Sequence, residues 1–397
     1  MFALTGAFGT STMVFYVFSA LWSVVSLGFF RFEFDTRPLA KSLGAIMALY
    51  FFAAVLLAIV HWGERDSMFE VLLRLPFIFV FAVLARIAVS TGDELIEAME
   101  NGALAGAALA ALITIAELVA GKSRPFAFSG NANVFSLANA LLFLICILAV
   151  RRRGGIQGLV FLAGATAAAF CIVVGGSRPM WLASPLAATL VARLLPIPAV
   201  RLPWSRLALT IFVALVLGLG AAGWGSFSDR IAAIVEDAGA SMQASDSNGS
   251  LASRKVMWRC GLEIGAENPL AGAGPGAARE YMRQCSLHAT GRELAYSHYH
   301  NMVIDGLAKG GLLQVFTVLL TLLLPVWAVF SWARPVTAEG RTLACYGKTL
   351  AFGTVTIFAF SGSTGLFLGH DVHDALFLWI LVLAFQITST GNRQTKL

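Results

Sequence analysis

The sequence predicts an all-α polytopic integral membrane protein, and three observations support that fold class. Of the 397 residues, 58% are hydrophobic and only 13% are charged, and the mean hydropathy is +0.78. Apolar runs of about 20 residues, the length at which a helix crosses a bilayer, recur along the chain. Because lipid offers no hydrogen bonds to an irregular backbone, we expect each run to be a helix.

The apolar runs divide the chain into three parts. Residues 1–224 contain about eight predicted membrane helices, residues 225–299 form one large polar loop, and residues 300–397 contain about three more helices. The prediction is therefore about 11–12 transmembrane helices, with the count most open at 92–104 and 362–372. The expected spans lie at roughly 6–30, 41–62, 68–91, 98–121, 130–150, 155–176, 179–197, 205–224, 311–332, 343–362 and 373–390.

The distribution of Lys and Arg over the short loops predicts the orientation, because cytoplasmic loops carry the excess of positive charge. One set of loops carries twelve such residues: Arg31, Arg37, Lys41, Arg151, Arg152, Arg153, Arg201, Arg206, Arg334, Arg341, Arg393 and Lys396. The alternate set carries four: Arg65, Lys122, Arg124 and Arg178. The first set is thus expected inside, which puts the loop 225–299 outside, in the periplasm of a Gram-negative cell, with the C-terminus inside.

Charge and targeting signals exclude other classes of protein. The net charge of +6 comes from basic residues dispersed among apolar segments, so we expect no nucleic-acid partner and do expect contact with membrane lipids. The first apolar run is long and continues directly into Arg31, which is typical of a span and not of a cleavable signal.

Cys260 and Cys285 both lie in the polar loop and can form a disulfide if that loop faces an oxidising compartment.

The polar loop contains two predicted helices and a turn. Ser241 to Ser250 is rich in Ser, Asp, Asn and Gly and is expected to be flexible. Ala252 to Ile264 is predicted to be a helix that ends before Gly265, and Ala277 to Gln284 a second short helix. Between them, the glycine-rich run 268–276 either brings backbone N–H groups to a phosphate or simply makes a turn.

The stretch Ser297-His298-Tyr299-His300-Asn301 ends this loop and begins a strongly apolar helix. If Ser297 caps that helix, His298 and His300 lie in its first turn. There the helix dipole favours an anion such as phosphate and keeps an imidazole neutral and able to accept a proton. The alternative is that both residues are ordinary interfacial histidines.

Two arginines on the outward side are candidates for binding an anion. Arg178 follows Gly175-Gly176-Ser177 and precedes Pro179, so it is held on a tight turn between two spans. A guanidinium there offers a planar fork to phosphate oxygens, although contact with lipid headgroups is the alternative. Arg254 lies four residues before Trp258 on the same face of the first loop helix, where a solvated charge is the alternative.

Other outward polar groups carry weaker signals. Lys122 and Arg124 follow a span that contains Glu117, which either lines a cavity or reaches the interface. The cluster His370-Asp371-Val372-His373-Asp374 contains possible zinc ligands, but Asp371 or Asp374 also suits helix capping. No Asp-x-Asp pair and no phosphate-binding GxxxxGK[ST] run occurs. We therefore expect neither a metal nor another cofactor.

Taken in order, the outward motifs resemble those of the O-antigen ligase and polymerase superfamily of bacterial membrane proteins. They are Gly176-Ser177-Arg178; Ser253-Arg254 with Trp258 and the run Pro269-Leu270-Ala271-Gly272-Ala273-Gly274; and His300-Asn301 followed by Gly311. Ser129 to Asn133 is similar to the family's entry to a span. Gln314 departs from the family's Gly-x-x-Gly ending. The similarity covers roughly residues 120–315, and ligases are resembled more closely than polymerases.

The resemblance implies a GT-C-like glycosyltransferase in the bacterial inner membrane, with its site facing the periplasm. The implied donor is a glycan on undecaprenyl pyrophosphate, and the acceptor is a hydroxyl of lipid A-core or of another glycan. His300 is then the expected general base, and Arg178 and Arg254 stabilise the leaving group. His298, Asn301, Lys122, Arg124 and Trp258 are the expected substrate-binding residues.

An alternative from a different class is a lipid or ion transporter. It predicts charged pairs near the middle of the bilayer and two-fold internal repeats, and the sequence shows neither clearly.

Overall fold

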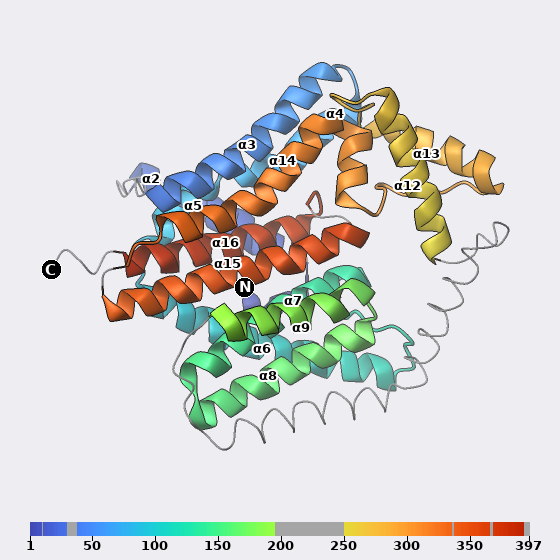
Figure 1. The fold of residues 1–397 in the computed structure, drawn as a ribbon. Helices are drawn as coiled ribbons and strands as arrows, with labels where there is room; N and C mark the ends of the chain where they lie inside the picture. Colours follow the sequence, from blue (N-terminus) through green and yellow to red (C-terminus); the bar gives the residue numbers. More distant parts are fainter. Residues whose placement is uncertain (10, 30–37, 195–249, 336, 366–367, 393–397) are drawn as a thin grey trace.

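The computed structural model describes residues 1–9, 11–29, 38–194, 250–335, 337–365 and 368–392. Every regular element in these ranges is a helix (Figure 1), so the all-α prediction is confirmed. The helices are α1 (Phe2–Thr5), α2 (Ser11–Phe29), α3 (Pro38–Val60), α4 (Arg65–Ile78), α5 (Val80–Ile87), α6 (Gly92–Val119), α7 (Ala132–Arg153), α8 (Gly155–Gly175), α9 (Arg178–Leu194), α12 (Ser250–Glu267), α13 (Pro275–Thr290), α14 (Met302–Trp332), α15 (Ala338–Thr364) and α16 (Asp371–Gly391).

Nine helical segments of the described ranges are long and apolar enough to cross a membrane, with α4 and α5 counted as one. They coincide with expected spans, and α9 follows the predicted span 179–197 as far as it is described. The expected span 205–224, the start of the polar loop and the segment 241–249 lie outside the described residues. The multi-pass membrane character predicted from composition is confirmed.

The bounds of three helices differ from the expected ones. The span 68–91 is divided at Phe79, three residues after Pro76, where α4 ends and α5 begins. In the polar loop, the first helix runs on to Glu267, so the prediction that Gly265 follows its end is wrong. The second loop helix is also longer than predicted and extends from Pro275 to Thr290.

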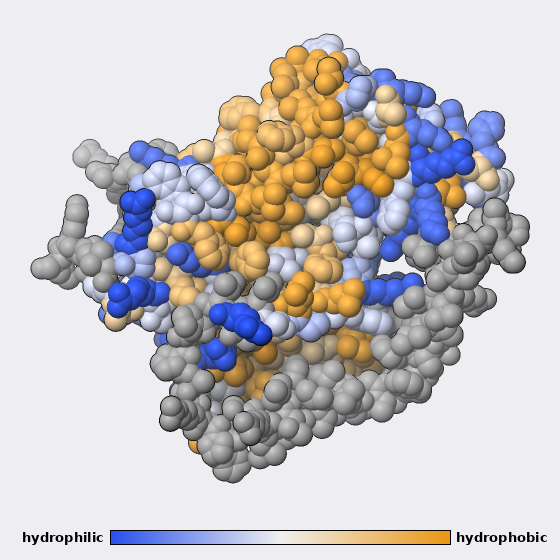
Figure 2. All heavy atoms as spheres, viewed as in Figure 1, coloured by the Kyte–Doolittle hydropathy of each residue, from blue (hydrophilic) through white to orange (hydrophobic). Residues whose placement is uncertain are grey.

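Two helices form the centre of the bundle. About 94% of the apolar window of α16 and 83% of that of α7 are buried, against 28% for α2 and for α6. In Figure 1, α15 and α16 lie between a group containing α3 and α14 and a group containing α6, α8 and α9. Figure 2 shows hydrophobic surface over α3 and α14 between two hydrophilic ends, the appearance expected of a lipid-facing band.

The polar helices α12 and α13 lie at one end of the bundle, and the turn between α3 and α4 attaches them (Figure 1). Glu64 accepts hydrogen bonds from the backbone N–H groups of Gly276 and Ala277, at 2.6 and 3.0 Å, where α13 begins. Arg279 of α13 forms an ion pair with Asp66. A carboxylate at a helix start compensates unsatisfied N–H groups, so the two helices are fixed to the membrane bundle.

At the other end, α7 finishes in an ion-pair cluster. The buried carboxylate of Glu100 accepts hydrogen bonds from Arg152 and Arg153, each at 2.8 Å, and from the Tyr346 hydroxyl at 3.2 Å. Residues at the start of α7 line the same cavity as Arg254 of α12. Because α7 ends here, the two polar ends of the molecule lie on opposite sides of the bundle.

Candidate functional site

A cavity of about 440 Å³ lies at the end of the bundle that carries α12 and α13. Its walls come from the starts of α7, α9 and α16, from the segment before α14, from the end of α15, and from α12. No carboxylate belongs to the lining formed by the described residues. Its titratable side chains are all cations or imidazoles, from Arg124, Arg178, Arg254, His298, His300, His370 and His373.

Helix starts give this cavity a second source of positive potential. The side chain of Asn131 caps α7 by accepting the N–H of Asn133 at 2.7 Å. Arg178 is the first residue of α9, and His370 caps α16. All of these residues line the cavity. Free N–H groups and the positive ends of helix dipoles favour a bound anion, so the site suits phosphate groups.

The three arginines approach one another without an acidic residue among them in the lining. Arg124 donates from Nε to the carbonyl oxygen of Gly175 at 3.0 Å, which fixes it beside the turn before Arg178. Burial lowers the pKa of Arg124, and the charges of Arg178 and Arg254 lower it further. Burial and then the charge of Arg178 lower the pKa of Arg254. The guanidinium groups stay charged at neutral pH, so an anion would relieve their mutual repulsion.

The histidines sit just before α14 and not in its first turn, so the prediction that Ser297 caps this helix is wrong. Asn301 is the cap, because its side-chain oxygen accepts the N–H groups of Val303 and Ile304 at 3.0 and 3.2 Å. His300 has a φ of +53°, a left-handed conformation that is uncommon for a residue with a side chain. Its Nδ1 atom is buried and has no hydrogen-bond partner among the described residues.

Both imidazoles are held neutral. Burial lowers the pKa of His300 to about 4, with further lowering by His298 and Arg254. Burial likewise lowers the pKa of His298 to about 4, followed by the charges of Lys309, His370 and Arg254. The ring centroids of His298 and His300 are 4.2 Å apart. At neutral pH each ring can therefore accept a proton, although weakly while the cavity is empty of anions.

The glycine-rich run of the loop serves a different purpose from phosphate binding. Inside α14, Gly311 has a non-helical φ of +62°, and this breaks the helix. Ala273 donates its N–H to the carbonyl of Ala308 at 2.9 Å, and Leu312 donates to the carbonyl of Pro269 at 2.8 Å. The run is absent from the cavity lining. It satisfies backbone groups that the break in α14 leaves open.

Three of the expected substrate-binding residues lie outside the cavity lining. Lys122 forms an ion pair with Glu117 at 2.5 Å, and Glu117 also accepts the N–H of Ala127 at 2.8 Å, so this pair orders the loop before α7. Trp258 does not line the cavity, and its Nε1 atom is buried with no hydrogen-bond partner among the described residues. Asn301 acts on the backbone, as the cap of α14 and as a donor to the carbonyl of Ser363 at 3.0 Å.

The His370 cluster is divided between two tasks. His370 caps α16 and lies 3.0 Å from a carboxylate oxygen of Asp371. Asp374 is buried and accepts the N–H of Gly369 at 2.8 Å. The helix cap is thus His370, and neither aspartate takes that position as the sequence suggested. His370 and His373 line the cavity with ring centroids 5.2 Å apart.

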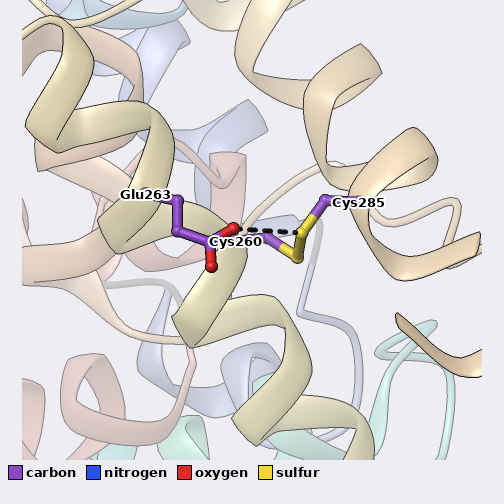
Figure 3. Close-up of side chains that lie close together, drawn as sticks. All are labelled: Cys260, Glu263 and Cys285. Atoms are coloured by element: carbon purple, nitrogen blue, oxygen red, sulfur yellow. Dashed lines mark hydrogen bonds between the residues drawn. A yellow bond between two sulfur atoms is a disulfide. The ribbon is translucent and has the colours of Figure 1, made fainter. Parts of the chain in front are cut away.

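The disulfide that the sequence left open is present and joins α12 to α13 through Cys260 and Cys285. Glu263 Oε2 lies 3.6 Å from the sulfur of Cys285 (Figure 3). Although these three side chains form a compact group, the bridged sulfurs are not thiolates, the form in which cysteine binds a metal. The group is therefore structural.

Two polar residues near the site, Asp305 and Lys309, were not identified from the sequence. Asp305 and Lys309 lie inside what reads as an apolar helix, and both are buried. An acid and a base four residues apart on a membrane helix are costly unless paired, and that spacing was the one available signal.

The motif residues predicted as catalytic thus meet at one cavity, together with Arg124 and His298. Comparison with protein families gives a match to the O-antigen ligase family over residues 163–319. That stretch runs from α8 into α14 and contains Arg178, Arg254 and His300. No curated protein matches the chain. Residues 163–319 match the O-antigen ligase family, and this match supports the predicted resemblance to the O-antigen ligase and polymerase superfamily.

Proposed function

We propose that this protein is a metal-independent, GT-C-like glycosyltransferase that moves a glycan from undecaprenyl pyrophosphate to a sugar hydroxyl of lipid A-core. The observation that carries the proposal is the convergence of Arg124, Arg178, Arg254 and His300 on one cavity whose described lining has no carboxylate. The match to a family of ligases and polymerases supports the class of reaction. The site would face the periplasm of the inner membrane, as the loop charges predict.

The arginines and helix starts would hold the pyrophosphate. As the bond between the anomeric carbon and the pyrophosphate oxygen breaks, negative charge grows on the leaving group. Preorganised guanidinium groups and backbone N–H groups stabilise that charge in the transition state. Undecaprenyl pyrophosphate would leave with the electron pair of the broken bond, so no metal ion is required to neutralise it.

His300 would remove the proton of the acceptor hydroxyl while the hydroxyl oxygen attacks the anomeric carbon. Its pKa of about 4 belongs to a site without substrate, where burial and Arg254 oppose protonation. A bound pyrophosphate brings negative charge and raises that pKa, because an opposite charge favours the imidazolium. Proton acceptance is then effective only when the donor is in place.

A polymerase of the same superfamily is the alternative, since it would use the same donor with a second glycan as acceptor. The deciding experiment is the lipopolysaccharide of a deletion strain. A ligase predicts core without polymer and accumulation of lipid-linked polymer, whereas a polymerase predicts core that bears a single repeat unit. Wild-type lipopolysaccharide would count against both functions.

The chemistry is tested with purified protein and an undecaprenyl-pyrophosphate glycan. Transfer should proceed at the same rate with and without EDTA. Loss of transfer in EDTA, restored by a divalent ion, would overturn the metal-independent mechanism.

A further inference from the structure

Asp305 and Lys309 form a buried ion pair one helical turn apart in the first part of α14. Asp305 Oδ2 and Lys309 Nζ are 3.0 Å apart, and each side chain is only 7% exposed. Neither residue lines the large cavity. Burying two charges is expensive, and a well-packed apolar pair often stabilises a fold equally well or better. The pair therefore calls for an explanation beyond stability.

Each member of the pair also holds the backbone of the histidine segment. Asp305 Oδ1 accepts the N–H of Tyr299 at 3.0 Å. Lys309 Nζ donates to the carbonyl oxygen of Ser297 at 3.0 Å. The two contacts lie on either side of His298 and end one residue before His300. An apolar pair would provide neither the acceptor nor the donor.

The segment needs such contacts because His300 is in a left-handed conformation, with φ at +53°. An unfavourable backbone conformation persists only when its surroundings hold it. The neighbouring side chains are also anchored: the Tyr299 hydroxyl donates to the carbonyl of Ala278 at 2.6 Å, and Asn301 caps α14. Around His300, the imidazole is thus the group left to meet a substrate.

We propose that Asp305 and Lys309 are positioning residues that hold His298 and His300 in their reactive geometry. This inference rests on the proposed function of His300. It assigns the two residues no contact with donor or acceptor. Removing them should lower the turnover rate while leaving the pyrophosphate-binding arginines intact.

The test is the double substitution Asp305→Leu with Lys309→Met, which removes both charges together and leaves no unpaired ion. With the undecaprenyl-pyrophosphate glycan as donor, kcat should fall on the order of 10- to 100-fold, because a small misplacement of a reacting group has an effect of that size. The KM for the donor should change little. Lys309→Arg, which keeps the charge and the donors, should retain most of the wild-type kcat.

The matched control is Arg259→Gln with Glu263→Gln, an exposed pair with the same spacing on α12, which should leave kcat unchanged. A folded Leu–Met variant with wild-type kcat would overturn the proposal. If the Leu–Met variant does not fold, the double variant Asp305→Asn with Lys309→Met is compared with the single variant Lys309→Arg. Equal kcat values for these two variants would then overturn the proposal.

His300→Asn is assayed alongside these variants. Loss of transfer in His300→Asn together with full kcat in the Leu–Met variant would leave the proposed function standing and remove the positioning role. Full transfer in His300→Asn would remove the general-base role of His300 on which this inference rests, whereas absence of transfer in the wild-type protein would remove the proposed function itself.

Discussion

The imidazole rings of His298 and His300 lie with their centroids 4.2 Å apart, at the end of a polar segment that contributes Arg254 to the same cavity. Burial lowers the pKa of His300, and the neighbouring His298 lowers it further. The two neutral imidazoles lie beside three guanidinium groups. A dianionic ligand bound there would raise the pKa of His300.

Replacing His300 should remove transfer without unfolding the protein. Because φ at this position is +53°, Asn and Gly are better probes than Ala, since both tolerate the left-handed region. His300→Asn and His300→Gly should each reduce kcat about 10²- to 10⁴-fold, the usual effect of losing a general base. His298→Ala should have the smaller effect on kcat. A larger loss in His298→Ala than in His300→Asn would move the base to His298.

Arg178→Lys should be strongly impaired although the charge is kept. A lysine cannot offer the planar pair of N–H groups that grips phosphate oxygens. The loss of a charged hydrogen bond corresponds to about 1.5–3 kcal/mol, or about 10- to 100-fold in the transfer rate. Arg259→Lys, at an exposed position of α12, is the matched control and should keep wild-type activity. Equal transfer rates for the two variants would show that Arg178 does not contribute to transfer.

The pH profiles of free enzyme and enzyme–donor complex should differ. A base acts only when it is deprotonated, so the rate falls as the pH drops below its pKa. The pKa of His300 is about 4 without substrate, so protonation of His300 should not lower kcat/KM until the pH falls below about 5. The acidic limb of kcat should lie at higher pH, because the bound pyrophosphate raises the pKa. Coincident limbs would contradict the proposed coupling between donor binding and proton transfer.

Labelling with a membrane-impermeant maleimide should distinguish the two polar ends of the bundle. Glu267→Cys, on the exposed surface of α12, should react in intact spheroplasts. Glu339→Cys, exposed at the start of α15, should react only after the membrane is permeabilised. The three cysteines outside the disulfide are buried or partly buried and give the background in the unmodified protein. The reverse labelling pattern would invert the orientation and remove the periplasmic mechanism.

Removing the disulfide should destabilise the polar helices. The two cysteines are 25 residues apart, and a bridge that closes a loop of that length contributes about 3 kcal/mol in the chain-entropy description. Cys260→Ala with Cys285→Ala should therefore lower the thermal midpoint, and reductant should lower that of the wild-type protein alone. Cys345→Ala is the control, because Cys345 forms no disulfide. An unchanged midpoint in the double variant would show that the bridge contributes no stability.

The sequence predicted the membrane helices well, because a span depends mainly on the hydropathy of its own residues. It also predicted that Arg178, Arg254 and His300 share one face, since each lies at the outward end of a span or in the polar loop. The start of α14 was misplaced because Ser297 and Asn301 are both good caps, and the choice depends on tertiary contacts. Asn301 is held at the cap position by its hydrogen bond to the carbonyl of Ser363. Tyr299 is held by hydrogen bonds to Asp305 and to the carbonyl of Ala278.

The roles of Lys122 and the glycine-rich run were not readable from the sequence for a related reason. Lys122 follows Glu117 closely in the sequence, but only the folded loop shows that the two charges pair. The glycine-rich run matched a motif, yet a motif does not reveal which backbone it contacts. Its partner is the break at Gly311, and that break appears only once the chain has folded.

The break in α14 has a mechanical consequence. The run 269–274 is hydrogen-bonded on both sides of Gly311. Ala273 and Gly274 donate to the carbonyls of Ala308 and Lys309, and Leu312 and Leu313 donate to the carbonyls of Pro269 and Leu270. The loop between α12 and α13 therefore bridges the break and ties the half-helix that follows the histidine segment to the long half of α14. A tilt of the long half within the membrane would then be transmitted to the histidine segment, a coupling that transfer rates in bilayers of increasing acyl-chain length would reveal.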